Sequence, residues 1–528
     1  MGAGPPERRG ESESHRAARG GSAPSGSPVV AVIAALTLAL HLAVSGVYGL
    51  FIDELYFLAC GEHLAWGYVD MPPLTAAQAW LARALFGDSL PAIRLFPALA
   101  AAGLVLLAGA IARALGGRRF AQAMAALAVA VAPGYLLAGS YLSMNSIEPL
   151  VWMGCVLVLI TIVRGGDARL WLAFGVLAGI GLENKDTVLV FGFAVVAGLL
   201  LTAERRLLAS RWFLLGGVVA FLIFLPNLVW MFEHHFPHLE MLANIRRSHR
   251  NVELSPFQFI AQQAIFLGPL AAPLWLAGLW HLLARRQGRP YRGVGLAYVV
   301  LMVVLLAAHG RVYYPLPFYA VLFAAGAVAF EGWAGRARLV WLKPAYAGLV
   351  LLGGAVLAPL AMPMLPPETY LRYTRALRLR PPQIEHRKAS ALPQLFADRF
   401  GWPEMAETVA RVYHALPAAD QARCAIFGND YGEAGAIDFY GPKLGLPKAI
   451  SGHLTYWYWG PRGYTGECMI VLGDTRAGAE RWFSEVEPVA EVGSRYAMAQ
   501  EHFTVFLCRK PKRFATLQQA WPLLKNWN

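Results

Sequence analysis

Long blocks of apolar residues, separated by short clusters of arginine, are the feature that most limits what this chain can fold into. A helix needs about 20 predominantly apolar residues to cross the hydrocarbon core of a bilayer. Blocks that approach this length predict membrane spans near residues 29–50, 90–112, 120–140, 147–163, 212–232, 258–283, 295–308, 315–331 and 345–363. The chain is therefore expected to be a polytopic α-helical membrane protein.

The apolar stretch 170–203 is too long for a single span. It is interrupted by the polar residues Glu183, Asn184, Lys185 and Asp186. We expect two short helices that meet at this polar apex, which brings the predicted number of spans to about eleven.

The basic residues predict which helix ends face the cytoplasm. They fall in alternate loops, as the positive-inside rule requires. The clusters include Arg113, Arg118 and Arg119; Arg164 and Arg169; Arg205, Arg206 and Arg211; and Arg285, Arg286, Arg289 and Arg292. The N-terminus is then cytoplasmic, and the loops near residues 53–70, 140–146, 185 and 233–255 face the other side.

The distribution of charge argues against nucleic acid as a partner. The chain is 57% hydrophobic and 15% charged, with a formal net charge of +13. Its arginines form short clusters between apolar blocks and no single basic stripe, so membrane topology explains them better than a nucleic-acid surface does.

Four segments of different composition predict the domain organisation. Residues 1–28 read as a disordered cytoplasmic tail, 29–363 as the transmembrane domain, 364–390 as a basic linker, and 391–528 as an extracytoplasmic α/β domain. The linker either lies on anionic lipid head groups or is a solvated connector.

The C-terminal segment alternates short apolar runs with helical patterns. Strands are expected near 424–427, 468–472 and 503–508, and helices over 402–414 and 477–486. An extracytoplasmic location would permit one disulfide among Cys424, Cys468 and Cys508, and the sequence leaves the pair open.

The first outer loop carries the acids that most resemble a site. Asp53 and Glu54 follow the first span, and Asp70 precedes Pro72-Pro73, with Tyr56 between them. Ionisable groups at a bilayer boundary are costly unless they meet water, a cation or a substrate. The alternative is that these acids cap the helices that follow them.

Other outer loops add polar candidates. Asn145 and Glu148 lie one helical turn apart in the second loop, where Asn145 also suits a helix cap. Lys185, at the polar apex, either pairs with Glu183 or Asp186 or contacts a lipid phosphate.

The segment from Glu233 to Arg250 combines histidines and arginines. His234 and His235 beside a carboxylate would suit a divalent metal cation, although the spacing lacks the HExxH form. The guanidinium groups of Arg246, Arg247 and Arg250 suit phosphate recognition. The later segment HGRVYYPLPFY places Tyr313 and Tyr314 on the same side, where they offer aromatic surface for a sugar.

Together these residues resemble the family 39 glycosyltransferases of the GT-C class, which include protein mannosyltransferases and the bacterial aminoarabinose transferase of lipid A. The resemblance covers about residues 29–363. It rests on the pair Asp53-Glu54, the acid before Pro-Pro, SMNSIEPLVW, the helix ending at Lys185, PNLVW followed by HHFP, and HGRVYYPLPFY.

The resemblance implies an enzyme of the bacterial inner membrane that moves a sugar from a polyprenyl-phosphate carrier, with undecaprenyl phosphate as the expected carrier, to an extracytoplasmic acceptor with inversion. The acceptor is a lipid, a glycan or a protein. Asp53 would match the catalytic base, and Asp70 the acid that holds a cation or orients the carrier phosphate. His234 or His235 would match a second metal ligand. Membrane lipid is an expected partner.

Two positions depart from the family pattern. Met71 stands where the aminoarabinose enzyme has a phosphate-contacting lysine, so Lys185 or an arginine of 246–250 must take that role. Asn145 stands where many relatives have an acid, with Glu148 as a substitute.

Two other functions compete with this one. A transporter or flippase of lipid-linked sugars would use the same cavity without chemistry, but transporters often carry internal repeats, and none is evident. A third reading makes the C-terminal domain the working module, binding glycan through Tyr456, Trp457 and Trp459.

Overall fold

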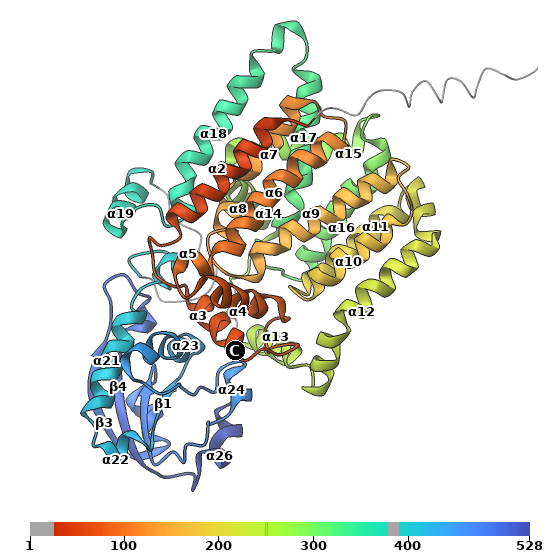
Figure 1. Cartoon of the computed structure of the whole chain (residues 1–528). Helices are drawn as coiled ribbons and strands as arrows, with labels where there is room; N and C mark the ends of the chain where they lie inside the picture. Colours follow the sequence, from red (N-terminus) through yellow and green to blue (C-terminus); the bar gives the residue numbers. More distant parts are fainter. Residues whose placement is uncertain (1–25, 249, 251, 379–389) are drawn as a thin grey trace, which may run out of the picture.

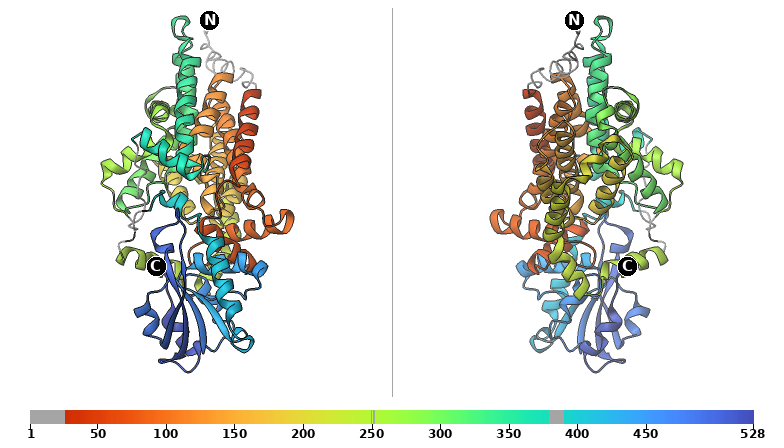
Figure 2. Two further views of the ribbon diagram at one scale, coloured as in Figure 1. Left: turned by 90° about the vertical axis from the view of Figure 1, so that its left-hand side faces the viewer. Right: turned by 90° about the vertical axis from the view of Figure 1, so that its right-hand side faces the viewer.

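The computed structural model describes residues 26–248, 250, 252–378 and 390–528. Most of the expected N-terminal tail, and residues 379–389 of the expected linker, lie outside the described residues. A bundle of long helices forms one end of the molecule, and a small sheet with its own helices forms the other (Figure 1). The two further views show the same division (Figure 2).

Every predicted membrane span contains helix. The helices of the bundle are α2 (Pro28–Val44), α6 (Leu95–Ala114), α7 (Arg119–Val131), α8 (Pro133–Ala138), α9 (Met144–Val163), α10 (Leu170–Leu182), α11 (Thr187–Leu200), α12 (Arg211–Glu233), α14 (Pro256–Leu267), α15 (Ala272–Ala284), α16 (Arg292–Ala307), α17 (Tyr319–Trp333) and α18 (Leu342–Ala361). The two short helices α10 and α11 meet at residues 183–186, as the sequence predicts.

The expected number of spans is not confirmed. Within the described residues, six helices are long and apolar enough to cross a membrane, or seven if α14 and α15 count as one span. The remaining apolar helices, including α2, α7, α10 and α11, are shorter. The predicted span 258–283 is broken, because α14 and α15 are bent by 97°. Gly268 lies at this bend with φ of 85°, which glycine adopts without steric cost.

The outer helices of the bundle expose apolar side chains, as lipid contact requires. Only 11% of the apolar window of α12 is buried inside the protein. Leu214, Phe221 and Phe232 are exposed by 66%, 50% and 72%. Because the backbone groups of a helix are satisfied internally, such a surface is stable in hydrocarbon. The chain is a multi-pass membrane protein.

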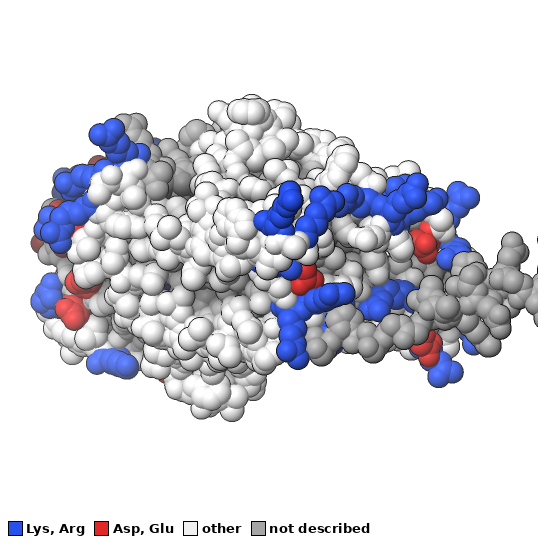
Figure 3. All heavy atoms as spheres, turned by 90° about the horizontal axis from the view of Figure 1, so that it is seen from above, with Lys and Arg blue, Asp and Glu red and all other residues white. Residues whose placement is uncertain are grey.

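The basic clusters lie at the end of the bundle away from the sheet. The loop between α6 and α7 carries one cluster, and the connections before α12 and α16 carry others. Seen from that end, Lys and Arg side chains outnumber Asp and Glu (Figure 3). The alternation predicted from the sequence thus places these charges on one face.

Short helices lie between the bundle and the sheet. Helices α3 and α4 cross this boundary after the first long helix, and α13 lies near them (Figure 1). The bounds of the short helices are α3 (Ile52–Glu62), α4 (Leu74–Phe86), α5 (Leu90–Ile93), α13 (Pro237–Arg247) and α19 (Pro367–Ala376). Helix α19 lies within the segment expected to be a linker.

The C-terminal part is built on a four-stranded sheet in the order β1-β2-β4-β3. Strands β1 and β2 are parallel, and β4 is antiparallel to both β2 and β3. Cys424 and Cys468 are partners in the register of β1 and β2 and form the disulfide. The elements are β1 (Cys424–Gly428), β2 (Cys468–Leu472), β3 (Phe483–Val492), β4 (Phe503–Pro511), α20 (Gln394–Ala397), α21 (Trp402–Ala415), α22 (Ala418–Gln421), α23 (Tyr431–Tyr440), α24 (Tyr456–Trp459), α25 (Arg476–Glu480) and α26 (Leu517–Ala520).

One element of this part differs from the sequence prediction. The helix expected over 477–486 is the short helix α25, and β3 begins at Phe483. Strand β3 is at the edge of the sheet, and most of its residues are not buried. Its glutamates are typical of edge strands, where charge discourages pairing with other chains. These charges hid the strand pattern.

Two glycines bring α23 close to α3. A Cβ on Gly432 would lie 2.4 Å from Cγ1 of Ile52, and one on Gly435 would lie 3.0 Å from the backbone carbonyl carbon of Leu55. The contact surface of α23 therefore needs residues without side chains. This close packing joins the C-terminal part to the segment that carries Asp53.

We expect Gly435→Ala to destabilise the protein, because the backbone of Leu55 cannot move aside as a flexible side chain would. Overpacking of this kind typically costs about 1–3 kcal/mol. Thermal unfolding in detergent, followed by a thiol-reactive dye that detects the buried free Cys60, Cys155 and Cys508, measures the change. Gly192→Ala in α11 is the matched control, since a Cβ there meets nothing within 4 Å. Equal unfolding temperatures for the two variants would contradict the packing argument.

Candidate active site

A cavity of about 350 Å³ lies where the bundle meets the C-terminal part. Its walls come from segments far apart in the sequence, including α3, the start of α9, the α10–α11 apex, α13 and α23. They bring together many of the residues singled out in the sequence: Asp53, Tyr56, Asp70, Asn145, Lys185, Arg250, Tyr313 and Tyr314.

Asp53 lies in the first turn of α3 and is partly exposed to the cavity. The hydroxyl of Tyr431 donates a hydrogen bond of 2.7 Å to its Oδ1. Tyr431 is the first residue of α23, so this contact crosses from the C-terminal part to α3. The stretch that begins at Tyr431 resembles the C-terminal domain of a bacterial branch of the family, but the sequence assigned Tyr431 no role, because its partner is 378 positions away.

Asp70 is held by a chain of hydroxyl groups. The Tyr56 hydroxyl donates to Asp70 Oδ1 over 2.7 Å and lies 2.6 Å from Oγ1 of Thr455. The N–H of Val69 donates to the same Thr455 oxygen. Asp70 keeps some exposure to the cavity, but its depth within the protein raises its pKa, because burial disfavours the charged carboxylate.

Lys185 is held at the polar apex by partners on α9. Its Nζ donates to Asn145 Oδ1 over 2.7 Å and to Glu148 Oε2 over 2.8 Å. Its expected alternative partners, Glu183 and Asp186, are replaced by Glu148. The rings of Tyr313 and Tyr314 lie with centroids 5.4 and 4.9 Å from Nζ. Two predicted loops and the Tyr-Tyr segment therefore converge on one ammonium group.

Glu148 supports this cluster from behind the cavity wall. It is buried, and it also accepts a hydrogen bond from the Thr187 hydroxyl. It does not line the cavity; of the two contacts expected of it, with substrate or with another polar residue of the site, it makes the second. Its contact with the site is through Lys185.

Glu54 was expected to hold phosphate or metal, and the structure gives it a different place. Its side chain is fully buried, and Oε2 lies 2.6 Å from Nη2 of Arg94. Its two oxygens also accept the N–H groups of Phe51 and Leu142. Burial alone would raise the pKa of Glu54, but Arg94 and these partners hold it below its ordinary value. Glu54 therefore joins segments and does not reach the cavity.

His234 and His235 also lie away from the cavity. His234 stacks on Trp230 at 4.0 Å and bonds to its carbonyl oxygen. A turn with positive φ at His235 and Phe236 precedes α13, and it is His238 that lines the cavity, with Nε2 3.5 Å from Oδ2 of Asp186. The turn, which the sequence does not reveal, decides which histidine faces inward.

Of the three outer arginines, one lines the cavity and two do not. Arg250 lines the cavity, and its Nη1 donates to the Asn528 carbonyl oxygen over 2.9 Å. Arg246 and Arg247 lie in the last turn of α13 and are not part of the cavity wall. Arg311, from the segment before Tyr313, adds a further guanidinium to the wall.

The residues do not fit a resident metal ion. Among the residues that the structure describes, no group of three or more His, Cys, Asp and Glu side chains is placed to hold one. The predicted ligands Asp70, His234 and His235 are divided between the cavity and the end of α12. We therefore derive no step that uses a metal.

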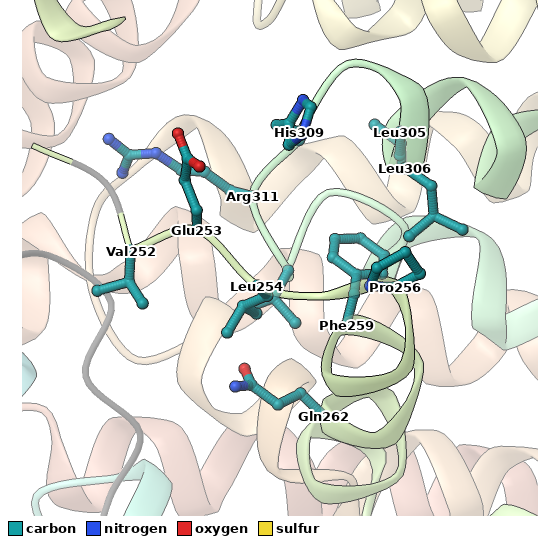
Figure 4. Close-up of a pocket in the computed structure, with 12 residues that line it drawn as sticks. Val252, Glu253, Leu254, Pro256, Phe259, Gln262, Leu305, Leu306, His309 and Arg311 are labelled. Carbon is teal, nitrogen blue, oxygen red and sulfur yellow. The ribbon is translucent and has the colours of Figure 1, made fainter. Parts of the chain in front are cut away.

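A smaller cavity of about 80 Å³ shares Arg311 with the main one. Residues 252–262 and the turn from His309 to Val312 line it, and His309 and Arg311 lie on the same turn (Figure 4). His309, the first residue of the segment HGRVYYPLPFY, lines this cavity and not the main one.

Comparison with known proteins agrees with the geometry. Residues 70–230 match the family model described as dolichyl-phosphate-mannose-protein mannosyltransferase. No curated protein matches the sequence. The fold is similar to that of ArnT from Cupriavidus metallidurans in the apo state, with a TM-score of 0.60 and 17% identity over 90% of this chain and 97% of that chain.

Two further structures are similar. ArnT from Cupriavidus metallidurans bound to undecaprenyl phosphate matches with a TM-score of 0.60 and 15% identity, again over 90% of this chain and 97% of that one. The arabinofuranosyltransferase AftD from Mycobacteria matches with a TM-score of 0.54 and 15% identity, over 92% of this chain and 40% of that one. The resemblance to the GT-C class predicted from the sequence is confirmed, and at these identities the solved structures show the fold.

Glu54→Gln tests whether Glu54 is structural. Breaking a buried ion pair leaves Arg94 uncompensated, so we expect a loss of about 3–5 kcal/mol and a low yield of folded protein. Because folding lowers the pKa of Glu54, the contribution of the pair is present above about pH 4.5 and is lost as the pH falls further. Unfolding temperature as a function of pH measures both effects.

The exposed ion pair of Glu480 with Arg476 provides the control, Glu480→Gln, which should change stability little. If a Glu54→Gln variant folds normally but no longer binds phosphate or metal, Glu54 is a binding residue and not a structural one.

Proposed function

We propose, for a chain with the fold of the GT-C glycosyltransferases, that it transfers a sugar from a polyprenyl-phosphate donor to an acceptor, with inversion, in the cavity between the bundle and the C-terminal part. The observation that carries the proposal is the charge pattern of this cavity. Asp53 and Asp70 lie in the walls from α3 and the following loop, and Lys185, Arg250 and Arg311 line the same space. A transfer from a phosphate leaving group needs both kinds of group.

In the proposed chemistry the acids assist formation of the new glycosidic bond, and the cations assist departure of the phosphate. The acceptor hydroxyl attacks the anomeric carbon as the bond from that carbon to the phosphate oxygen breaks. Asp53 takes the proton of the hydroxyl, and the bonding electrons leave with the lipid phosphate. Cations placed where this negative charge develops lower the barrier. The fold shared with ArnT, which has been solved with undecaprenyl phosphate, supports a lipid phosphate as the leaving group.

The remaining cavity residues suit binding of the sugar and carrier. Tyr313 and Tyr314 present rings beside Lys185, next to the proposed phosphate position. Asp70, with its raised pKa and its bond from Tyr56, is placed to orient the donor by hydrogen bonds. Asn145 fixes the ammonium group of Lys185 from the other side.

We place the cavity and the C-terminal part on the extracytoplasmic side of a bacterial inner membrane. The basic clusters at the opposite end of the bundle favour this orientation. The disulfide between Cys424 and Cys468 favours it independently, since disulfides persist in oxidising compartments.

Asp53→Asn tests the proposed base. The amide cannot accept the proton, so transfer in membranes supplied with radiolabelled polyprenyl-phosphate sugars should fall by about 100-fold or more. Asp88→Asn, in the exposed ion pair with Arg83, is the matched control and should keep full activity. Transfer by Asp53→Asn at the wild-type rate would exclude Asp53 as the base. If wild type moves labelled lipid across the membrane but consumes no donor, the chain is a transporter.

A pair of variants tests Lys185 as a phosphate ligand. Lys185→Met alone should fold poorly, because it leaves the Glu148 carboxylate buried without its cation. Adding Glu148→Gln removes that charge and should restore the yield of folded protein. The double variant should still show a KM for the lipid donor raised about tenfold or more, since a charge-assisted contact to phosphate is lost. A wild-type KM in the folded double variant would assign the phosphate to the arginines alone.

A further inference from the structure

Hydroxyl groups from the C-terminal part reach both acids of the cavity. Tyr431 donates directly to Asp53, and Thr455 bonds to Tyr56, which donates to Asp70. Neither acid is therefore held by the membrane bundle alone. The C-terminal part contributes to the geometry of the groups that were assigned to the transmembrane domain.

We propose that the C-terminal α/β part supplies the positioning residues of the active site, with Tyr431 orienting Asp53 and Thr455 orienting Asp70 through Tyr56. This inference rests on the proposed function and goes beyond it, because it makes the C-terminal part necessary for the chemical step. A part that only covers the cavity or selects the acceptor would have no such contacts.

The chemistry of the Tyr431 contact fits a general base. A hydrogen bond donated to a carboxylate favours its ionised form and limits rotation of the side chain. A carboxylate offers about four acceptor sites, and the bond from Tyr431 occupies one of them. Tyr431 therefore orients the Asp53 carboxylate and favours its ionised form.

Tyr431 is itself held from several directions. Asp430 and Glu433 form a capping box at the start of α23, and the Tyr431 N–H donates to Nδ1 of His453 over 3.3 Å. The centroid of the Tyr431 ring lies 5.0 Å from that of Tyr56. The tyrosine that bonds to Asp53 therefore packs against the tyrosine that bonds to Asp70. The close packing of Gly432 and Gly435 on α3 fixes the distance between the helices.

Other charges around Asp53 stay constant when the Tyr431 hydroxyl is removed. The titratable and charged groups that line the same cavity are Tyr56, Asp70, Tyr141, Lys185, Asp186, His238, Arg250, Arg311, Tyr313, Tyr314 and Asp398. A change in the titration of Asp53 between wild type and Tyr431→Phe therefore reports the loss of the Tyr431 hydroxyl.

The test compares full-length wild type, Tyr431→Phe and the control Tyr413→Phe, which removes a hydroxyl bonded to the Gln421 carbonyl in α21 and α22. We expect Tyr431→Phe to lower kcat about tenfold and to move the acidic limb of its pH profile upward by about one pH unit. The KM for the lipid donor should change less than about twofold, since the hydrogen bond that is lost goes to Asp53 and not to a phosphate.

A second measurement does not depend on transfer. Carbodiimides label protonated carboxyl groups, and peptide mass spectrometry gives the labelling of Asp53 as a function of pH. The pH at the midpoint of the Asp53 labelling curve should rise in Tyr431→Phe and not in Tyr413→Phe. Thr455→Val should move the curve of Asp70 in the same way, and Thr455→Ser, which keeps the hydroxyl, should restore it.

The outcomes separate this inference from the proposed function. If wild type transfers no sugar but the labelling curves move as expected, the proposed function fails and the positioning contacts stand. If wild type is active and Tyr431→Phe changes neither pH profile nor labelling, the inference is overturned. A Tyr431→Phe variant that loses only folded yield, with an unchanged pH limb, overturns it as well.

Discussion

The buried ion pair of Glu54 and Arg94 is the interaction on which the arrangement of the site depends. It ties the first turn of α3 to the junction of α5 and α6. The other partners of the pair are the carbonyls of Ser45, Tyr48 and Gly49 and the N–H groups of Phe51 and Leu142. Adjacent residues of a helix point about 100° apart, so holding Glu54 inside the bundle turns its neighbour Asp53 toward the cavity. Two adjacent acids thus serve opposite purposes.

The sequence was informative where one local pattern decides the outcome. Apolar blocks predicted the helices, and the polar residues around Lys185 predicted the apex between α10 and α11. The acids Asp53 and Asp70 were found because charge near a bilayer boundary is costly. The sequence was less informative where geometry is set by distant contacts. The bend between α14 and α15, and the turn that brings His238 inward in place of His234, depend on backbone conformations that composition does not encode.

The contacts from the C-terminal part were beyond sequence reasoning for a physical reason. Tyr431 and Thr455 lie in or beside stretches that resemble the family but hold no nucleophile with its base, and their partners are hundreds of residues away. Two glycines on α23 are the nearest thing to a signal, since glycine inside a helix costs stability unless close packing needs it. Without the partner helix, that requirement is invisible. Strand β3 was missed for a related reason, because its exposed edge permits charges at positions that a central strand would keep apolar.

The division of the site between two parts has a consequence for how the cavity works. The cations belong mainly to the bundle side, where Glu148 holds Lys185 against the α10–α11 apex. The hydroxyls that hold the acids belong to the C-terminal side. A displacement of α23 from α3 would therefore release Asp53 from Tyr431 while leaving Lys185, a proposed phosphate ligand, with its partners on α9. Since catalytic geometry tolerates errors of only a fraction of an ångström, the docking of α23 on α3 controls the position of the proposed base.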